Sequence, residues 1–293
     1  MRYTGLILVF LFTCLLASGQ VTVTIGKGSG ADQKAAAVGN APGTPQKTVI
    51  TGVAPGAERK TIQLTTPGDL ITYLENPLAT AKVDSTGHFS MSFNLTRTVY
   101  SIISIDFHKA ELYLEPDKTY DIRIEPMNYN DDAEINPFIQ SQNLAIALSD
   151  TSRNELNNMI RTFNDFHSAF LMEHFNALYR DHNKPLLDTF RILLNQHFGS
   201  IENLYFFNYA NYKLASLDQL TRYYGQAQLM RKYFTDKPVL YENVEYMDFF
   251  NNFFSKYITA TSTILRKTDC TALFKDPDPY ARFQKFMATD TLL

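Results

Sequence analysis

Short runs in which apolar and polar residues alternate occupy residues 48–126, and turn-forming residues separate them. Alternation places successive side chains on opposite faces of a strand, so each run predicts a half-buried β-strand. The predicted strands are Thr48–Ile50, Thr61–Leu64, Ala81–Val83, Phe89–Phe93, Tyr100–Phe107, Leu112–Leu114 and Tyr120–Ile124. About seven short strands at this spacing predict a small antiparallel β-sandwich domain over residues 48–126.

From residue 138 to residue 293 the apolar residues recur every three or four positions, which predicts amphipathic helices. A polar connector, residues 127–137, separates these helices from the predicted strands. One apolar stripe on the first predicted helix contains Leu156, Met159, Ile160, Phe163, Phe166 and Phe170. The sequence therefore predicts an α+β chain of two domains, in which a small antiparallel β-sandwich is followed by an all-α helical domain.

Residues with capping side chains mark the predicted ends of these helices. Ser152 and Glu155 have the spacing of a capping box, so Ser152 is the predicted N-cap of the first helix. Asn183, with a proline two positions later, predicts the start of the second helix, and Gly199 predicts its end. Ser200 is the predicted N-cap of the third helix.

Residues 1–19 have the layout of a secretory signal peptide. Arg2 precedes the apolar run Leu6–Ala17, and small residues end that run. The run is shorter than the roughly 20 residues that a spanning helix needs, so no transmembrane segment is expected after removal of the signal. Lipidation at Cys14 is a weaker alternative, because Thr13 does not suit the position before a lipidated cysteine. The sequence predicts export to the periplasm or the outer cell surface.

Residues 20–47 are rich in Gly, Ala and Pro and show no hydrophobic period, which predicts a flexible linker. The chain as a whole is 45% hydrophobic and 13% aromatic, a composition typical of folded proteins. Its net charge of −3 argues against a nucleic-acid partner, because such partners require a basic surface. A protein partner in the cell envelope is expected instead. The oligomeric state stays open.

The cysteines exclude dithiol chemistry within this sequence. Cys14 lies in the predicted signal peptide, which leaves Cys270 alone, and no C-x-x-C motif occurs. Asp269 lies next to Cys270 and opposes formation of a thiolate. The sequence predicts an unreactive thiol and no cofactor.

The histidines do not have the spacing of a metal site. His167 and His174 lie two helical turns apart, about 10 Å along the axis, and no H-E-x-x-H motif occurs. Neighbouring phenylalanines favour histidines at the edge of the core. His108 and Glu111 lie near a strand end and are expected to point to opposite faces. No metal site is predicted.

Other candidate chemistry is weak. A run of oxygen donors between the two predicted domains lacks the spacing and the central glycine of an EF-hand, so a solvated linker is favoured over a calcium site. That run contains Asn128, Asn130, Asp131, Asp132 and Glu134. The sequence has no G-x-S-x-G, S-x-x-K or Walker-type motif, and no catalytic residue is predicted. A hydrolase with unrecognised carboxylates stays as a third alternative.

An aromatic stripe near the end of the helical region is the one candidate interaction face. It contains Tyr241, Tyr246, Phe249, Phe250, Phe253 and Tyr257. Tyrosine and phenylalanine can form recognition surfaces, but a helix packed into an aromatic core produces the same pattern and is favoured. The absence of tryptophan from the sequence weakens a carbohydrate-binding role.

Two groups of motifs resemble parts of TlpA-like thiol-disulfide reductases of Bacteroidota-type envelopes. Ala81-Lys82-Val83-Asp84 with Gly87 and Phe89, followed by Leu112–Pro116 and Tyr120–Ile122, resembles the β-sandwich domain of unknown function that precedes their thioredoxin domain. Lys237–Asn243 and Tyr246–Phe250 resemble their helical connector. The order of elements, a signal followed by a sandwich and then by helices, also agrees with that family, and the resemblance covers residues 48–293.

The sequence differs from that family at the redox site. It contains no counterpart of the W-C-x-x-C motif, which performs thiol–disulfide exchange in the family's thioredoxin domain. No catalytic residue is therefore carried over. The first hypothesis is an exported binding or scaffold module, accessory to a TlpA-like thiol-disulfide system and without catalytic residues of its own. The alternative is a truncated reductase that lacks its redox domain.

Overall fold

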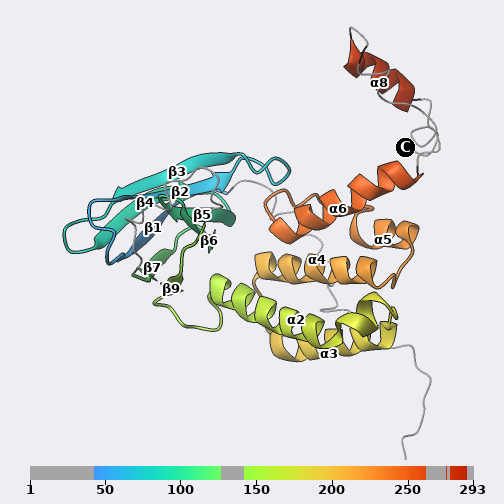
Figure 1. Ribbon diagram of the computed structural model, residues 1–293, viewed down its shortest axis with the longest axis horizontal. Coiled ribbons are helices and arrows are strands. Elements are labelled where there is room, and N and C mark those ends of the chain that lie inside the picture. The colour runs from blue at the N-terminus through green and yellow to red at the C-terminus, as the bar shows by residue number, and fades with distance from the viewer. Residues whose placement is uncertain (1–42, 127–141, 262–274, 276–277, 289–293) are drawn as a thin grey trace, which may run out of the picture.

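The computed structural model describes residues 43–126, 142–261, 275 and 278–288. Within them the fold is mixed α+β, with two sheets at one end and the helices α2 to α6 at the other (Figure 1). The strands are β1 (Gln46–Val53), β2 (Thr61–Pro67), β3 (Glu75–Lys82), β4 (His88–Leu95), β5 (Val99–Ile105), β6 (His108–Leu114), β7 (Thr119–Ile124), β8 (Gln142–Asn143) and β9 (Ile146–Leu148). The helices are α2 (Leu156–Tyr179), α3 (Lys184–Phe198), α4 (Leu204–Leu220), α5 (Gln226–Tyr233), α6 (Val244–Thr261) and α8 (Pro279–Met287).

The strands form a four-stranded sheet, ordered β4-β1-β7-β9, and a five-stranded sheet, ordered β3-β2-β5-β6-β8. Neighbouring strands are antiparallel except β1 with β7 and β6 with β8. Burial alternates strictly along β4 and β7, as the sequence pattern predicts. One buried cluster draws apolar side chains from both sheets, among them Ile50 and Ile122 of the first and Leu64 and Ile103 of the second.

Strands β8 and β9 correct the predicted start of the helical region. Residues 138–293 were expected to be all-α, yet residues 142–148 pair with one sheet and then with the other. The N–H of Leu144 donates to the carbonyl of Lys109 (2.8 Å), and the N–H of Glu125 donates to the carbonyl of Ala145 (2.9 Å). These bonds satisfy backbone groups at two sheet edges that would otherwise lack partners. This tertiary requirement decides the conformation of residues 142–148, against the helix that their local sequence pattern predicts.

The helix starts are partly those expected. Asn183 caps α3, where its side chain accepts from the N–H of Leu186 (3.1 Å), and Gly199 is the C-cap, as predicted. The other two predicted caps are wrong. Glu155 caps α2, because its carboxylate accepts from the N–H of Asn158 (2.8 Å), and Asn203 caps α4. Hence α2 begins one turn later than the Ser152 prediction, and α4 begins later than the Ser200 prediction.

The helices bury their apolar faces in two clusters. One lies among α2, α3 and α4 and includes Phe163 and Phe190, while the other lies among α4, α5 and α6 and includes Phe249. Tyr113 of β6 belongs to the first cluster, and Leu70 of the β2–β3 loop belongs to the second. Side chains from the sheets therefore complete both helical cores.

Polar contacts also connect the sheets with the start of α4, with α6 and with the loop before α6. Asn203 donates to the carboxylate of Glu115 (2.9 Å), and the Tyr73 hydroxyl donates to Asp248 of α6 (2.8 Å). An ion pair joins Arg97 and Glu242 (2.6 Å). The contacts come from three separate loops between strands, so several points hold the sheets against the helices.

Four sequence predictions fall wholly or mainly outside the described residues: the signal peptide 1–19, most of the linker 20–47, the connector 127–137 with its oxygen donors, and Cys270. The linker is shorter than expected at its end, because β1 already begins at Gln46.

Candidate functional site

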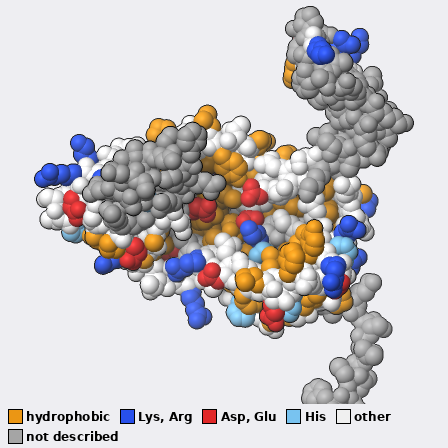
Figure 2. Space-filling model, in the orientation of Figure 1, with side chains coloured by type: hydrophobic (Ala, Val, Ile, Leu, Met, Phe, Trp, Pro, Cys, Tyr) orange, Lys and Arg blue, Asp and Glu red, His pale blue; other side chains and the backbone are white. Residues whose placement is uncertain are grey.

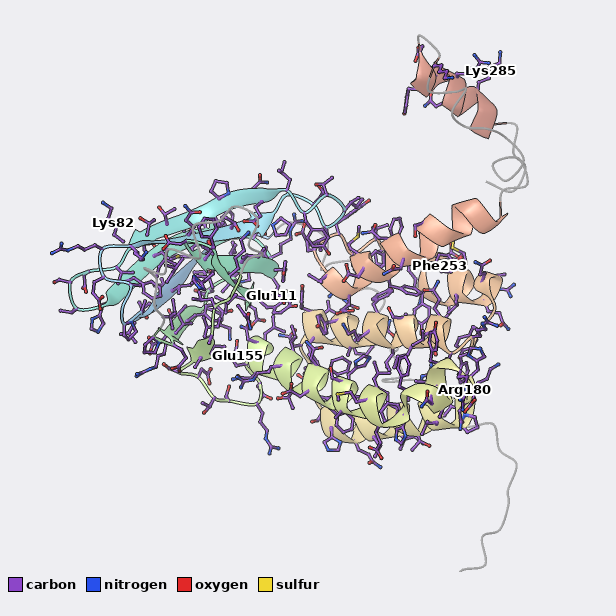
Figure 3. The ribbon with its side chains drawn as sticks, viewed as in Figure 1. Lys82, Glu111, Glu155, Arg180, Phe253 and Lys285 are labelled. Carbon is purple, nitrogen blue, oxygen red and sulfur yellow. The ribbon has the colours of Figure 1, made fainter. Side chains whose placement is uncertain are left out.

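A groove lies at the junction of the sheets and α2 and holds about 710 Å³ of space open to solvent. Its walls are the end of β6, strand β9 and the first three turns of α2. Figure 2 shows acidic and basic side chains beside hydrophobic ones in the hollow between the sheets and the helices, and Figure 3 places Glu111 at this junction. The lining residues are Glu111, Leu112, Tyr113, Ile146, Leu148, Asn157, Asn158, Ile160, Arg161, Asn164 and Asp165.

Strand β6 presents one edge to this groove. The side chain of Asn157 accepts from the N–H of Tyr113 (2.7 Å) and donates to its carbonyl (2.9 Å), so both backbone groups of Tyr113 point away from β5. Backbone groups of alternate residues in a strand point to the same edge, so those of Glu111 also face the groove. No hydrogen bond from another described residue occupies these two groups.

The wall formed by α2 is unusually polar for its position. Asn157, Asn158 and Asn164 supply amide donors and acceptors, and Arg161 and Asp165 supply one charge of each sign. Asparagine is a poor helix former, so three of them in three turns weaken the local helix preference. The hydrogen bonds of Asn157 and Asn158 to the chain before α2 and to β6 offset that weakness.

Tyrosine hydroxyls connect the groove with the interior. Burial, followed by the negative charge of Glu111, raises the pKa of the Tyr100 hydroxyl, so this hydroxyl stays protonated near that carboxylate. On the other wall, the amide of Asn164 is hydrogen-bonded to the hydroxyl of Tyr209 (2.9 Å). The ring of Tyr113 packs between these two tyrosines, with centroids 5.6 Å from Tyr100 and 5.9 Å from Tyr209. These contacts with interior tyrosines hold Tyr113 and Asn164 in position in the groove wall.

A buried ion pair lies farther inside, between α4 and α6. Lys213 donates to the carboxylate of Glu245 (2.6 Å). Burial raises the pKa of Glu245, and the positive charge of Lys213 opposes that rise. The pair neutralises charge within the helical core and leaves Arg161, Asp165 and Glu111 as the charged groups that line the groove.

The predicted aromatic interaction face divides between core and surface. Tyr246, Phe249 and Phe253 are buried in the cluster of α4, α5 and α6, which corrects the expectation of an interaction face for these three residues. Phe250 is half-buried against the same cluster, while Tyr241 is exposed. The side chain of Tyr257 lies outside the described residues. Packing along one helix face therefore accounts for most of the stripe.

The histidines lie where the sequence placed them. His167 is buried and packs against Phe163, with ring centroids 6.0 Å apart, and His174 packs edge-on to Phe170 (4.7 Å). In β6, His108 is buried while Glu111 is exposed, so the two point to opposite faces as predicted. In the described part of the chain, no three His, Cys, Asp or Glu side chains gather to hold a metal ion.

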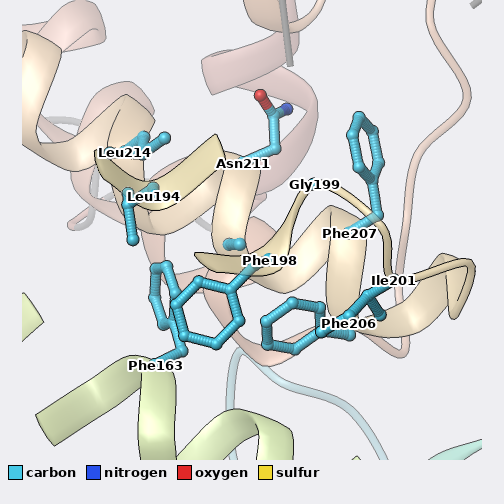
Figure 4. A pocket seen from close by; sticks show the side chains of 10 residues that line it. Phe163, Leu194, Phe198, Gly199, Ile201, Phe206, Phe207, Asn211 and Leu214 are labelled. Carbon is cyan, nitrogen blue, oxygen red and sulfur yellow. The ribbon is translucent and has the colours of Figure 1, made fainter. Parts of the chain in front are cut away.

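A second cavity lies within the helices and is apolar (Figure 4). Rings of Phe163, Phe198 and Phe206 line it, and Asn211 is the polar side chain at its wall. It is much narrower than the junction groove. The cavity is suited to one apolar group and lacks the mixed donors and acceptors of the groove.

The polar wall of α2 was not predicted from the sequence. The signal was present as three asparagines, an arginine and an aspartate at positions 157, 158, 161, 164 and 165, which fall on one side of a helix. Such a polar side is normally the solvated face of an amphipathic helix. Only the position of β6 and β9 opposite this face makes it a groove.

No protein-family model matches the chain, and the search of curated proteins gives no match. Among the described residues no helix combines the length and the apolar character needed to cross a membrane.

Proposed function

We propose that the protein is an exported cell-envelope binding module that recognises a segment of a protein partner in the junction groove. On this proposal an antiparallel β-sandwich domain and a helical domain form the two sides of the site. The strand edge at Glu111, beside the amide-rich wall of α2, is the observation that carries the proposal.

A polypeptide matches the chemistry of the groove. An extended segment presents alternating backbone donors and acceptors, and the N–H and C=O of Glu111, which no other described residue occupies, can pair with them as a neighbouring strand does. The amides of α2 offer further donors and acceptors, and Ile146 and Leu148 offer apolar contact to a side chain. The charges of Arg161 and Asp165 contribute orientation more than affinity.

The cellular role is proposed from the sequence. The leader-like residues 1–19 support export, and the motifs resembling TlpA-like proteins support a role beside a thiol-disulfide system. The module supplies binding in this role, and the redox chemistry belongs to its partner. Neither cofactor nor metal is required for the binding step.

Two matched pairs of variants test the groove. The immobilised chain is used to capture partners from an envelope extract of the organism that encodes it, with identification by mass spectrometry. Glu111→Ala keeps the outward N–H and Glu111→Pro removes it, and a proline is tolerated at a free strand edge. Arg161→Glu changes a groove charge, whereas Arg231→Glu on α5 changes an exposed charge elsewhere.

We expect the same partner on the wild type, Glu111→Ala and Arg231→Glu, strongly reduced capture by Glu111→Pro, and a smaller reduction by Arg161→Glu. Far-UV circular dichroism and urea unfolding confirm that each variant is folded. Equal capture by all folded variants would contradict a site in the groove. Reduction of insulin disulfides by the purified chain would contradict a purely binding role.

A further inference from the structure

The outer face of α2 carries three large hydrophobic side chains that the fold leaves in solvent. Met172 is 84% exposed, the largest value for any large hydrophobic residue in the described part of the chain, and Phe175 and Tyr179 are 53% and 54% exposed. Figure 2 shows hydrophobic side chains gathered over the helices on this face. We call Met172, Phe175 and Tyr179 the α2 stripe.

The α2 stripe has helical spacing, so its members lie along one side of the helix. The opposite side of α2 already holds the helix to its own core through Phe163 and Phe170. The rings of Phe175 and Tyr179 stack, with centroids 5.3 Å apart, which gives the stripe a continuous surface. A second apolar stripe on a helix that is already packed indicates a further helix as its partner.

We propose that the α2 stripe pairs with the α2 stripe of a second copy of the chain, antiparallel and with a two-fold axis at Met172. In this register Met172 meets Met172 of the second copy. Ala169 faces Phe175 of the second copy, so a small side chain lies opposite a large one, as close packing requires. Both contacts occur twice because the surface is self-complementary.

Charge complementarity fixes the direction of the pair. Asp165 and Arg180 lie on either side of Met172, at roughly 10 and 12 Å along the helix axis. An antiparallel pair brings Asp165 of each copy beside Arg180 and Tyr179 of the other, whereas a parallel pair places like charges together. In the single chain Arg180 pairs with Asp181 at an exposed site (3.0 Å). Exposed ion pairs are weak, so Arg180 can leave Asp181 and pair with Asp165 of the second copy.

The pair leaves the junction groove open. Asp165 is the groove residue closest to the α2 stripe, and the other α2 residues of the groove lie toward the start of the helix. Because α2 ends at Tyr179, the second copy's helix ends opposite Asp165 and does not cover the groove. The two sites share Asp165, but Met172, Phe175 and Tyr179 do not line the groove, so a Met172→Glu variant tests self-association without changing a residue of the peptide site.

The test is the mass of the full chain in solution, measured by sedimentation velocity over a concentration series. We expect a dimer that dissociates on dilution. Met172→Glu places two carboxylates at the two-fold axis and should raise the dissociation constant at least about tenfold. Leu74→Glu is the matched control, since Leu74 is 71% exposed in the loop before β3 and lies off the proposed interface.

A charge exchange tests the register independently of folding effects at Met172. Asp165→Arg and Arg180→Asp should each weaken the dimer, and the double variant should restore it. A wild type that is monomeric throughout, or a Met172→Glu variant that dimerises as well as Leu74→Glu does, would overturn the proposal and assign the α2 stripe to a different partner. Failure of the double variant to recover would overturn the antiparallel register.

Discussion

The side-chain amide of Asn157 pairs with both backbone groups of Tyr113, as a neighbouring strand would. The ring of Tyr113, meanwhile, is buried in the core of α2, α3 and α4. One residue of β6 therefore joins the helices through its backbone and through its side chain. This relationship fixes the start of α2 against β6 and defines the width of the junction groove.

Replacement of Asn157 should weaken this junction. Asn157→Ala removes both hydrogen bonds and leaves the N–H and carbonyl of Tyr113 unpaired, which should lower the free energy of unfolding by about 1–3 kcal/mol. Asn157→Asp should cost at least as much, because its carboxylate would lie against the carbonyl of Tyr113 and the carboxylate of Glu155, which both accept from the Asn157 amide. Urea unfolding followed by circular dichroism measures both. An Asn157→Ala variant as stable as the wild type would show that these bonds contribute nothing.

The start of α2 gives a second prediction. Glu155 accepts from the N–H of Asn158 in the structure, whereas Ser152 was the cap expected from the sequence. Glu155→Ala should therefore cost about 0.5–2 kcal/mol of stability, the usual range for an N-cap, and Ser152→Ala should cost clearly less. Thermal and urea unfolding of the two variants decides between the caps. A larger loss for Ser152→Ala would favour the capping-box prediction.

A buried carboxylate in the helices gives a third prediction. Asp218 of α4 is fully buried and contacts Arg191, Lys232 and the hydroxyl of Tyr233. Asp218→Asn removes the fully buried carboxylate that pairs with both Arg191 and Lys232, and breaking a buried pair in this way should destabilise the fold by about 3–5 kcal/mol.

The control for that variant is an exposed pair. Asp181→Asn removes the partner of Arg180 at the surface, where solvent screens the charges, so little change in the unfolding midpoint is expected. Similar midpoints for Asp218→Asn and Asp181→Asn would mean that Asp218 does not stabilise the helices through its charge.

His167 gives a prediction for pH. Burial, followed by the positive charge of Lys213, lowers the pKa of His167 to about 4. Above the ordinary pKa of about 6.5, the folded and unfolded chains are both neutral at this residue and stability is unaffected. Between pH 6.5 and 4 only the unfolded chain takes up the proton. The free energy of unfolding should therefore fall by about 1.4 kcal/mol for each unit by which the pH is lowered within this window.

Unfolding curves of the wild type and of His167→Leu over pH 4–7 check this point. The difference in stability between the two proteins should change with pH in this window and become constant above it. His88→Gln, at an exposed position, is the control and should run parallel to the wild type. A pH-independent difference between wild type and His167→Leu would show that the pKa of His167 is the same in the folded and unfolded chains.

Local patterns predicted those elements whose burial is periodic. The strict alternation of β4 and the capping side chain of Asn183 are both local properties, and both predictions are confirmed. Strand β3 was predicted only at Ala81–Val83, because most of its length from Glu75 is exposed or half-buried and gives little alternation.

Elements that depend on distant residues were not predictable in the same way. Strands β8 and β9 exist because the edges of β6 and β7 need hydrogen-bond partners, a requirement that residues 142–148 do not encode by themselves. The groove is a similar case. Asn157 and Arg161 look like a solvated helix face until Glu111, far away in the sequence, is placed opposite them.

The position of β8 and β9 late in the chain also governs the order in which the fold can be completed. During synthesis β6 and β7 emerge first, and each has an unpaired edge until residues 142–148 have followed. An unpaired edge is a template for association with other chains. Growing chains halted between β7 and β8 should therefore be more prone to aggregate than chains extended through β9 and the first turn of α2, where Asn157 pairs with the edge of β6 at Tyr113.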